Sequence, residues 1–114
     1  MTTLSFATSK GGAGKTTSAI ILGTTLARKG HLVTLIDADP AARLMEWHKK
    51  TLDSSVTLKN LTVLASEGES TIADEIEWAN SKSDFVLIDL EGAATMTNSV
   101  VMAESDLVLL VMGD

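Results

Sequence analysis

Short continuous apolar runs alternate with longer segments of helical pattern along this chain of 114 residues. The runs have the length and composition of strands, and they cover residues 4–7, 32–36, 61–65, 85–88 and 107–112. Strands buried on both faces give continuous rather than alternating apolar runs, so the pattern favours a parallel sheet with helices on each side. We therefore predict an α/β fold, a doubly wound and Rossmann-like sheet of five parallel strands, in one domain at residues 1–114.

Helices are expected between these strands, at residues 15–29, 41–50 and about 70–80. In the first helix, Gly30 can take the left-handed conformation that ends a helix, whereas Gly23 weakens the helix interior. Ser70 can cap the third helix. Trp47 lies on the apolar side of the second helix, where core or rim packing is a better interpretation than contact with a ligand.

The composition excludes several classes of function. The chain has no Cys, so disulfide frameworks, Cys-ligated zinc, iron–sulfur clusters and thiol catalysis are excluded. Its 9 Lys and Arg against 15 Asp and Glu give a net charge of −6, which argues against sequence-independent DNA binding by this chain alone. No apolar run approaches the roughly 20 residues of a bilayer span and no leader precedes the first strand, so a cytoplasmic location without membrane contact is expected.

A glycine-rich loop follows the first strand and leads directly into the first helix. It reads Ser9-Lys10-Gly11-Gly12-Ala13-Gly14-Lys15-Thr16-Thr17. The backbone groups expected to surround a phosphate belong to Gly11, Gly12, Ala13 and Gly14. In the P-loop pattern Lys15 neutralises the β- and γ-phosphates, Thr16 offers its hydroxyl to Mg²⁺, and Thr17 reaches the α-phosphate. A flexible surface turn is the alternative, which the strand–loop–helix context disfavours.

The fourth strand ends in a carboxylate, because Asp89 follows the apolar residues 85–88 in the Walker B form. Mg²⁺ prefers oxygen ligands and keeps several waters, so Asp89, Thr16 and phosphate oxygens are a sufficient site. Gly92 has the DxxG spacing of switch loops, in which its amide can bind the γ-phosphate.

The loop departs from the usual P-loop pattern, since Ser9 stands where that pattern has glycine. With Lys10 before two glycines, it resembles the deviant Walker A loop KGGxGK[ST] of the ParA/MinD family of ATPases. The resemblance implies a P-loop NTPase fold. It also implies that Lys10 is a catalytic residue acting in trans, reaching the phosphates of a partner subunit across a nucleotide-sandwich dimer.

A second acidic motif, Asp37-Ala38-Asp39-Pro40, follows the second strand and resembles the DxD segment of that family. The resemblance implies that Asp39 orients the attacking water as the catalytic carboxylate, and that Asp37 lies on the magnesium side of the site. Alternatively, Asp39 caps a helix that begins at Pro40, and both roles are compatible.

The resemblance implies a Mg²⁺-dependent ATPase that binds ATP, forms a homodimer and uses hydrolysis as a dimerisation switch in DNA partition, segregation or transfer. The stretch from Asp37 to Trp47 looks most like partition ATPases and the ParA-like proteins of T-DNA and conjugal transfer, so a partner of ParB or relaxosome type is expected. Complete members of the family are longer. Further strands and the DNA-binding surface would therefore lie outside this chain, which leaves residues 107–112 as an uncovered apolar edge.

Two other functions stay open from the sequence. The chain can be a nucleotide-binding fragment or interaction module with little or no turnover. It can also be a small-molecule kinase or amide-forming synthetase on the same P-loop scaffold, although Lys10 and the DxD segment fit that function less well.

Overall fold

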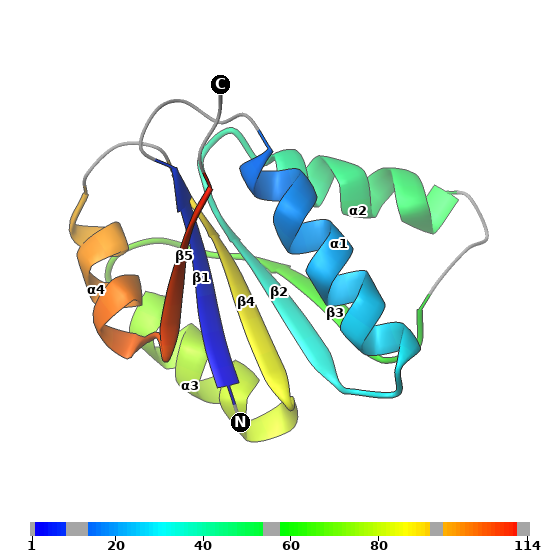
Figure 1. Cartoon of the computed structure of the whole chain (residues 1–114). Coiled ribbons are helices and arrows are strands. Elements are labelled where there is room, and N and C mark those ends of the chain that lie inside the picture. Colours follow the sequence, from blue (N-terminus) through cyan, green and yellow to red (C-terminus); the bar gives the residue numbers. More distant parts are fainter. Residues whose placement is uncertain (1, 9–13, 54–57, 92–94, 112–114) are drawn as a thin grey trace.

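The computed structural model describes residues 2–8, 14–53, 58–91 and 95–111 of the chain. Strands and helices alternate throughout, as Figure 1 shows. Their bounds are β1 (Thr2–Thr8), α1 (Lys15–Arg28), β2 (Val33–Ala38), α2 (Arg43–Asp53), β3 (Leu61–Ala65), α3 (Ile72–Lys82), β4 (Phe85–Leu90), α4 (Met96–Glu104) and β5 (Leu107–Val111).

The strands form one parallel sheet in the order β3-β2-β4-β1-β5, which confirms the predicted α/β class. β4 lies between β1 and β2, and Asp89 of β4 is in register with Phe6 on one side and Asp37 on the other. The carboxyl ends of β1, β2 and β4 therefore lie side by side at one edge of the sheet. Ligands bind at this carboxyl edge in open parallel sheets, where the chain reverses its direction of winding.

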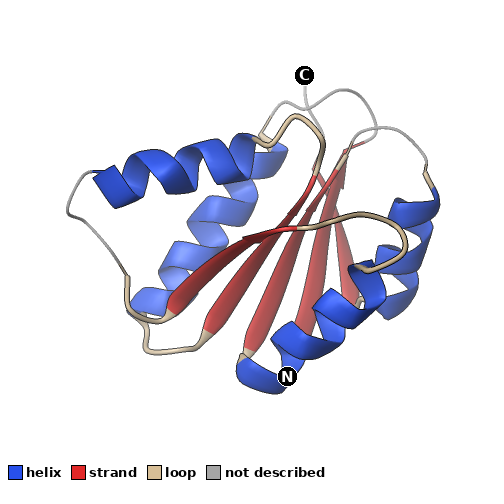
Figure 2. Ribbon diagram, turned by 180° about the vertical axis from the view of Figure 1, so that it is seen from behind, coloured by secondary structure: helices blue, strands red, loops and turns tan. Residues whose placement is uncertain are grey.

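Helices cover both faces of the sheet, α1 and α2 on one and α3 and α4 on the other (Figure 2). The core beneath α1 and α2 comprises Leu4, Phe6, Ala19, Ala27, Val33, Leu35, Leu44, Val63 and Leu87. The core beneath α3 and α4 comprises Ala7, Ile36, Ile72, Ile76, Ala79, Val86, Ile88, Leu90 and Val101. Successive residues of β2 and β4 point to opposite cores, so these central strands are apolar at most positions, as the continuous runs predict.

The helix bounds differ from the predicted ones by a few residues, for local reasons. α1 ends at Arg28, and Gly30 has the predicted left-handed conformation with φ of 95°. α2 begins at Arg43 rather than at residue 41, because Ala42 has a non-helical φ of 55°. Thr71, not the predicted Ser70, occupies the N-cap position of α3, and its side chain makes no capping hydrogen bond.

Gly23 has a role that helix propensity alone does not reveal. A β-carbon at this position would lie 2.7 Å from Cδ2 of Leu35, a contact too close for carbon atoms. The buried residues of α1 recur every four positions, at Lys15, Ala19, Gly23 and Ala27. The small residues among them, Ala19, Gly23 and Ala27, let α1 lie close against the sheet. This close approach positions Lys15 at the carboxyl edge of the sheet.

α4 was not predicted from the sequence. Thr95 caps it by accepting a hydrogen bond from the Asn98 amide at 3.1 Å, and its buried residues are Asn98 and Val101. With one apolar residue among its buried positions, the helix shows little of the apolar stripe from which surface helices are recognised.

β5 is an edge strand with exposed apolar side chains, as predicted for this region. Leu107 is 52% exposed and Leu110 is 56% exposed, while Leu109 and Val111 pack against the core beneath α1. Met112 lies outside the described residues. None of the described helices is both long enough and apolar enough to span a membrane.

Candidate nucleotide-binding site

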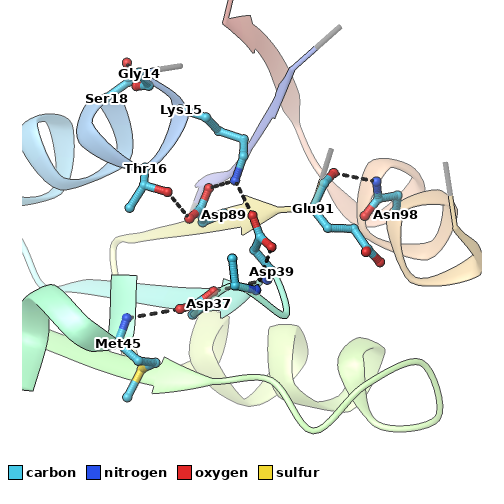
Figure 3. Close-up of polar contacts among 11 residues, drawn as sticks. Gly14, Lys15, Thr16, Ser18, Asp37, Asp39, Met45, Asp89, Glu91 and Asn98 are labelled. Carbon is cyan, nitrogen blue, oxygen red and sulfur yellow. Dashed lines mark hydrogen bonds and ion pairs between the residues drawn. The ribbon is translucent and has the colours of Figure 1, made fainter. Parts of the chain in front are cut away.

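Lys15 is a fully buried cation at the first turn of α1, with 1% of its surface exposed. Its Nζ atom donates hydrogen bonds to Oδ1 of Asp89 and, at 3.2 Å, to Oδ2 of Asp39 (Figure 3). The three residues come from three different elements and meet at the carboxyl edge of the sheet. A buried charge is tolerated when it is paired and hydrogen-bonded, and here two carboxylates hold one ammonium group.

The start of α1 has the backbone that a phosphate loop requires. Gly14 has a left-handed φ of 85°, and its carbonyl accepts the Ser18 amide at 2.8 Å. Only glycine takes this conformation without strain. The free amide groups of a helix N-terminus attract anions. Thr17 is exposed in the first turn of α1.

Asp89 is the most deeply buried carboxylate of the site, with 0% exposure. Its Oδ1 atom pairs with Lys15, and its Oδ2 atom accepts a hydrogen bond from the Thr16 hydroxyl at 2.7 Å. Among the described residues, no group of three or more His, Cys, Asp or Glu side chains could enclose a metal ion by itself. Thr16 and Asp89 nevertheless form a pair of oxygen donors, which is the chemistry Mg²⁺ selects when phosphate and water oxygens complete its shell.

Asp37 organises the backbone after β2. One of its carboxylate oxygens accepts the Asp39 amide at 3.1 Å and the other accepts the Met45 amide at 3.0 Å, so it joins the end of β2 to the first turn of α2. Burial raises the pKa of the Asp37 carboxyl above its ordinary value of 3.8, and the two amide hydrogen bonds only partly offset this effect. Each oxygen accepts one of these hydrogen bonds and has a second lone pair, so its predicted role on the magnesium side does not require either bond to be released.

Asp39 has one carboxylate oxygen in the turn and one toward the site. Oδ1 accepts the Ala41 amide at 3.0 Å, which is a turn contact and not a cap of α2, while Oδ2 pairs with Lys15. A cavity of about 180 Å³ adjoins this carboxylate. It is lined by Asp37, Ala38, Asp39, Pro40, Ser66, Glu67, Gly68, Glu91 and Thr97. Asp39 therefore has access to an open, polar space, which the more deeply buried Asp89 lacks.

The structure thus brings four of the predicted side chains, Lys15, Thr16, Asp39 and Asp89, into one hydrogen-bonded group. The other predicted residues Lys10, Gly11, Gly12, Ala13 and Gly92 lie outside the described residues. Sequence reasoning missed the contact between Asn98 Nδ2 and the Glu91 carbonyl, at 3.0 Å. The spacing from Thr95 to Asn98, typical of a helix cap followed by its first turn, is the signal that could have indicated α4.

Solved structures of partition proteins share this fold. A plasmid partition protein from Borrelia burgdorferi matches with a TM-score of 0.78 and 21% identity, over 96% of this chain and 63% of that protein. A structure of a plasmid partition protein from Borrelia burgdorferi B31 bound to AMPPNP matches with a TM-score of 0.74 and 21% identity, over 96% of this chain and 60% of that one. A ParA-family ATPase of Chlorobium tepidum and the MinC:MinD complex of Aquifex aeolicus are also similar in structure.

Sequence comparison gives relatives in the same group. Protein ParA of Rhizobium radiobacter is 41% identical over 93% of this chain and 46% of the relative. Protein virC1 of Rhizobium rhizogenes is 35% identical over 96% of this chain and 48% of the relative. The chain therefore spans about half the length of these curated relatives. The predicted ParA/MinD resemblance is confirmed. The family model described as VirC1 protein matches residues 1–112, and the chain belongs to this family of ParA-like proteins.

Proposed function

We propose that this chain forms the nucleotide-binding part of a ParA-like, Mg²⁺-dependent ATPase, which binds ATP and hydrolyses it as a dimerisation switch in DNA partition, segregation or transfer. The observation that carries the proposal is the position of Lys15 Nζ, which pairs with Asp39 and Asp89 directly behind the left-handed Gly14. A buried lysine at a helix N-terminus, between the carboxyl ends of parallel strands, is the arrangement expected for a phosphate site.

Lys15 exchanges partners when a nucleotide binds. Without an anion in the loop, its charge is neutralised by two carboxylates. The β- and γ-phosphate oxygens offer more negative charge at the N-terminus of α1, so Lys15 turns toward them and releases Asp39. The cost of breaking the pair with Asp39 is modest, because that carboxylate is 13% exposed and can be hydrated.

Asp39 then has a free carboxylate oxygen that borders the cavity. In the proposed reaction this oxygen accepts a hydrogen bond from the attacking water and orients it toward the γ-phosphate. The Ala41 amide holds the other oxygen in place, and Asp37 holds the Asp39 backbone. Lys15 stabilises the charge that develops on the phosphate oxygens.

Thr16 and Asp89 are the residues that would hold Mg²⁺. When bound, the ion neutralises charge on the β- and γ-phosphate oxygens. Thr16 already donates its hydroxyl hydrogen to Asp89, so both oxygens lie in one place before any ion binds. Asp89 is kept rigid by its position in the central strand β4.

Dimerisation, the trans role of Lys10 and partners of ParB or relaxosome type are also proposed for the complete protein. Similar structures support this direction, since pNOB8 ParA is bound to nonspecific DNA and MinD of Aquifex aeolicus is in a complex with MinC. A second candidate is a nucleotide-binding unit without turnover, which the coverage of only about half the length of the relatives favours.

Phosphate release and sedimentation velocity, each measured with ATP and Mg²⁺, separate the two candidates. The proposed ATPase releases phosphate without an added acceptor and sediments as a dimer when ATP is present. Asp39→Ala should retain nucleotide binding and lose turnover. Glu67→Ala, which changes an exposed carboxylate lining the same cavity, is the matched control and should retain turnover. Undiminished phosphate release by Asp39→Ala would refute the catalytic role of Asp39.

A further inference from the structure

Asn98 is a buried polar residue of α4 that contacts the segment leaving the site. It is 7% exposed, and its Nδ2 atom donates a hydrogen bond to the Glu91 backbone carbonyl at 3.0 Å (Figure 3). Glu91 stands two residues after Asp89, directly beyond the end of β4. This side chain therefore ties α4 to the backbone that extends from the Walker B strand.

The other end of this link is also fixed. The Asn98 amide donates to Oγ1 of Thr95 at 3.1 Å, which sets the first turn of α4. Val101, one turn further on, is completely buried in the core beneath α3 and α4. Asn98 thus projects from a helix that is capped at its start and anchored in the core by Val101.

The contact lies beside the cavity that Asp39 borders. Glu91 and Thr97, the latter from the first turn of α4, both line that cavity. A displacement of α4 would therefore be transmitted through Asn98 to Glu91, and from there along two residues of backbone to Asp89. Among the described residues, Asn98 is the α4 residue whose side chain donates a hydrogen bond to the Glu91 backbone.

We propose that Asn98 is a positioning residue, which couples the position of α4 to the position of Asp89. Through Asp89 it affects the Mg²⁺-dependent part of nucleotide binding. The inference rests on the proposed function. Asn98 touches neither Lys15 nor Thr16 in the described structure, so it acts through the backbone and not on the phosphates themselves.

The experiment compares ADP affinity in excess Mg²⁺ with ADP affinity in EDTA, by calorimetry. Asn98→Asp has nearly the same shape but, when ionised, loses the donor and adds a negative charge, whereas Asn98→Ala removes the side chain without adding a charge. Both should reduce the Mg²⁺-dependent gain in affinity by about fivefold to tenfold, the value of one lost hydrogen bond, with ADP affinity in EDTA unchanged. Ser99→Ala, which removes an exposed hydroxyl of α4 and leaves both the Thr95 cap and the Asn98 side chain in place, should keep the wild-type gain.

A merely structural role would lower the melting temperature of the two Asn98 variants and leave their Mg²⁺-dependent gain in ADP affinity equal to that of wild type and Ser99→Ala, which would overturn the inference. A pH series adds a rescue, because the carboxyl introduced by Asn98→Asp can donate to Glu91 once it is protonated. At each pH, the Mg²⁺-dependent gain in ADP affinity of Asn98→Asp is divided by the same gain of wild type. This ratio should rise as the pH falls. An unchanged ratio over a range in which both proteins stay folded would count against the proposed contact.

Hydrogen exchange tests the coupling of α4 to the Mg²⁺-dependent binding of nucleotide in the wild-type chain, without any variant. The α4 amides should exchange more slowly with ADP and Mg²⁺ than with ADP in EDTA, and equal rates would overturn the inference. The failures are distinguishable. Wild-type protein that binds no nucleotide refutes the proposed function and the inference together, whereas normal Mg²⁺-dependent binding by the Asn98 variants refutes the inference alone.

Discussion

Replacing Lys15 by Met should destabilise the fold even when no nucleotide is present. Lys15 is 1% exposed and Asp89 is 0% exposed, so the variant leaves a buried carboxylate whose one remaining described hydrogen-bond partner is Thr16. Removing one member of a buried ion pair typically costs about 3–5 kcal/mol. Asp39 adds little to this cost because water reaches it. We expect a loss of about 3 kcal/mol, a large share of the roughly 5–15 kcal/mol that stabilises an ordinary domain.

Urea unfolding followed by circular dichroism at pH 7 measures this loss. With a slope of about 2 kcal/mol per molar urea, the midpoint should fall by about 1.5 M. The double variant Lys15→Met/Asp89→Asn removes both charges and should recover most of the loss. Lys50→Met is the control, since its ion pair with Glu46 spans 3.6 Å on the surface and should be worth less than about 0.5 kcal/mol.

Two results of the urea experiment would refute this reasoning. If Lys15→Met lowers the unfolding free energy by less than about 1 kcal/mol, the buried pairing does not have the energetic weight that its geometry implies. A double variant as unstable as the single one would show instead that packing of the lysine stem, and not an uncompensated carboxylate, causes the loss.

Other predictions follow from individual contacts. Asp39→Ala should bind ADP no more weakly than wild type and up to about fivefold more tightly, because Lys15 no longer has to leave a partner; calorimetry that shows weaker binding would contradict this exchange of partners. Gly23→Ala should lower the unfolding free energy by about 1–2 kcal/mol, although alanine favours helices, because the new methyl group would lie 2.7 Å from Leu35; a more stable variant in urea would be the opposite result. The Asp37 carboxyl should titrate above 3.8 in carbon-detected NMR. Since its pKa is higher in the folded than in the unfolded chain, its contribution to stability should decline as the pH rises from 3.8 through the folded value, and Asp37→Asn should lack this component of the pH dependence.

The strand pattern and the site were predictable for the same physical reason. Continuous apolar runs predict parallel strands, and parallel strands place their carboxyl ends at one edge. Lys15, Asp39 and Asp89 each follow or end such a run, so their proximity follows from the fold class. The third strand was predicted with its observed bounds, because residues 61–65 are flanked by polar residues on both sides.

The parts that were missed depend on single contacts without a periodic signal. α4 is short, and one of its two buried residues is an amide, Asn98, whose partner is a backbone carbonyl. The closeness of α1 to the sheet depends on the shape of Leu35 against Gly23, which helix propensity does not include. Asp37 was interpreted from its motif alone, whereas its two hydrogen bonds depend on where α2 begins, and the φ of Ala42 sets that point.

Calorimetric titration of ATP in the presence of Mg²⁺ tests the central claim most directly. The wild-type chain should bind one nucleotide saturably, and Lys15→Ala, studied at a temperature at which its circular dichroism shows it folded, should lose that binding. Equal affinity in the two proteins, or no binding heat from the wild-type chain, would contradict the assignment of this edge of the sheet as a nucleotide site.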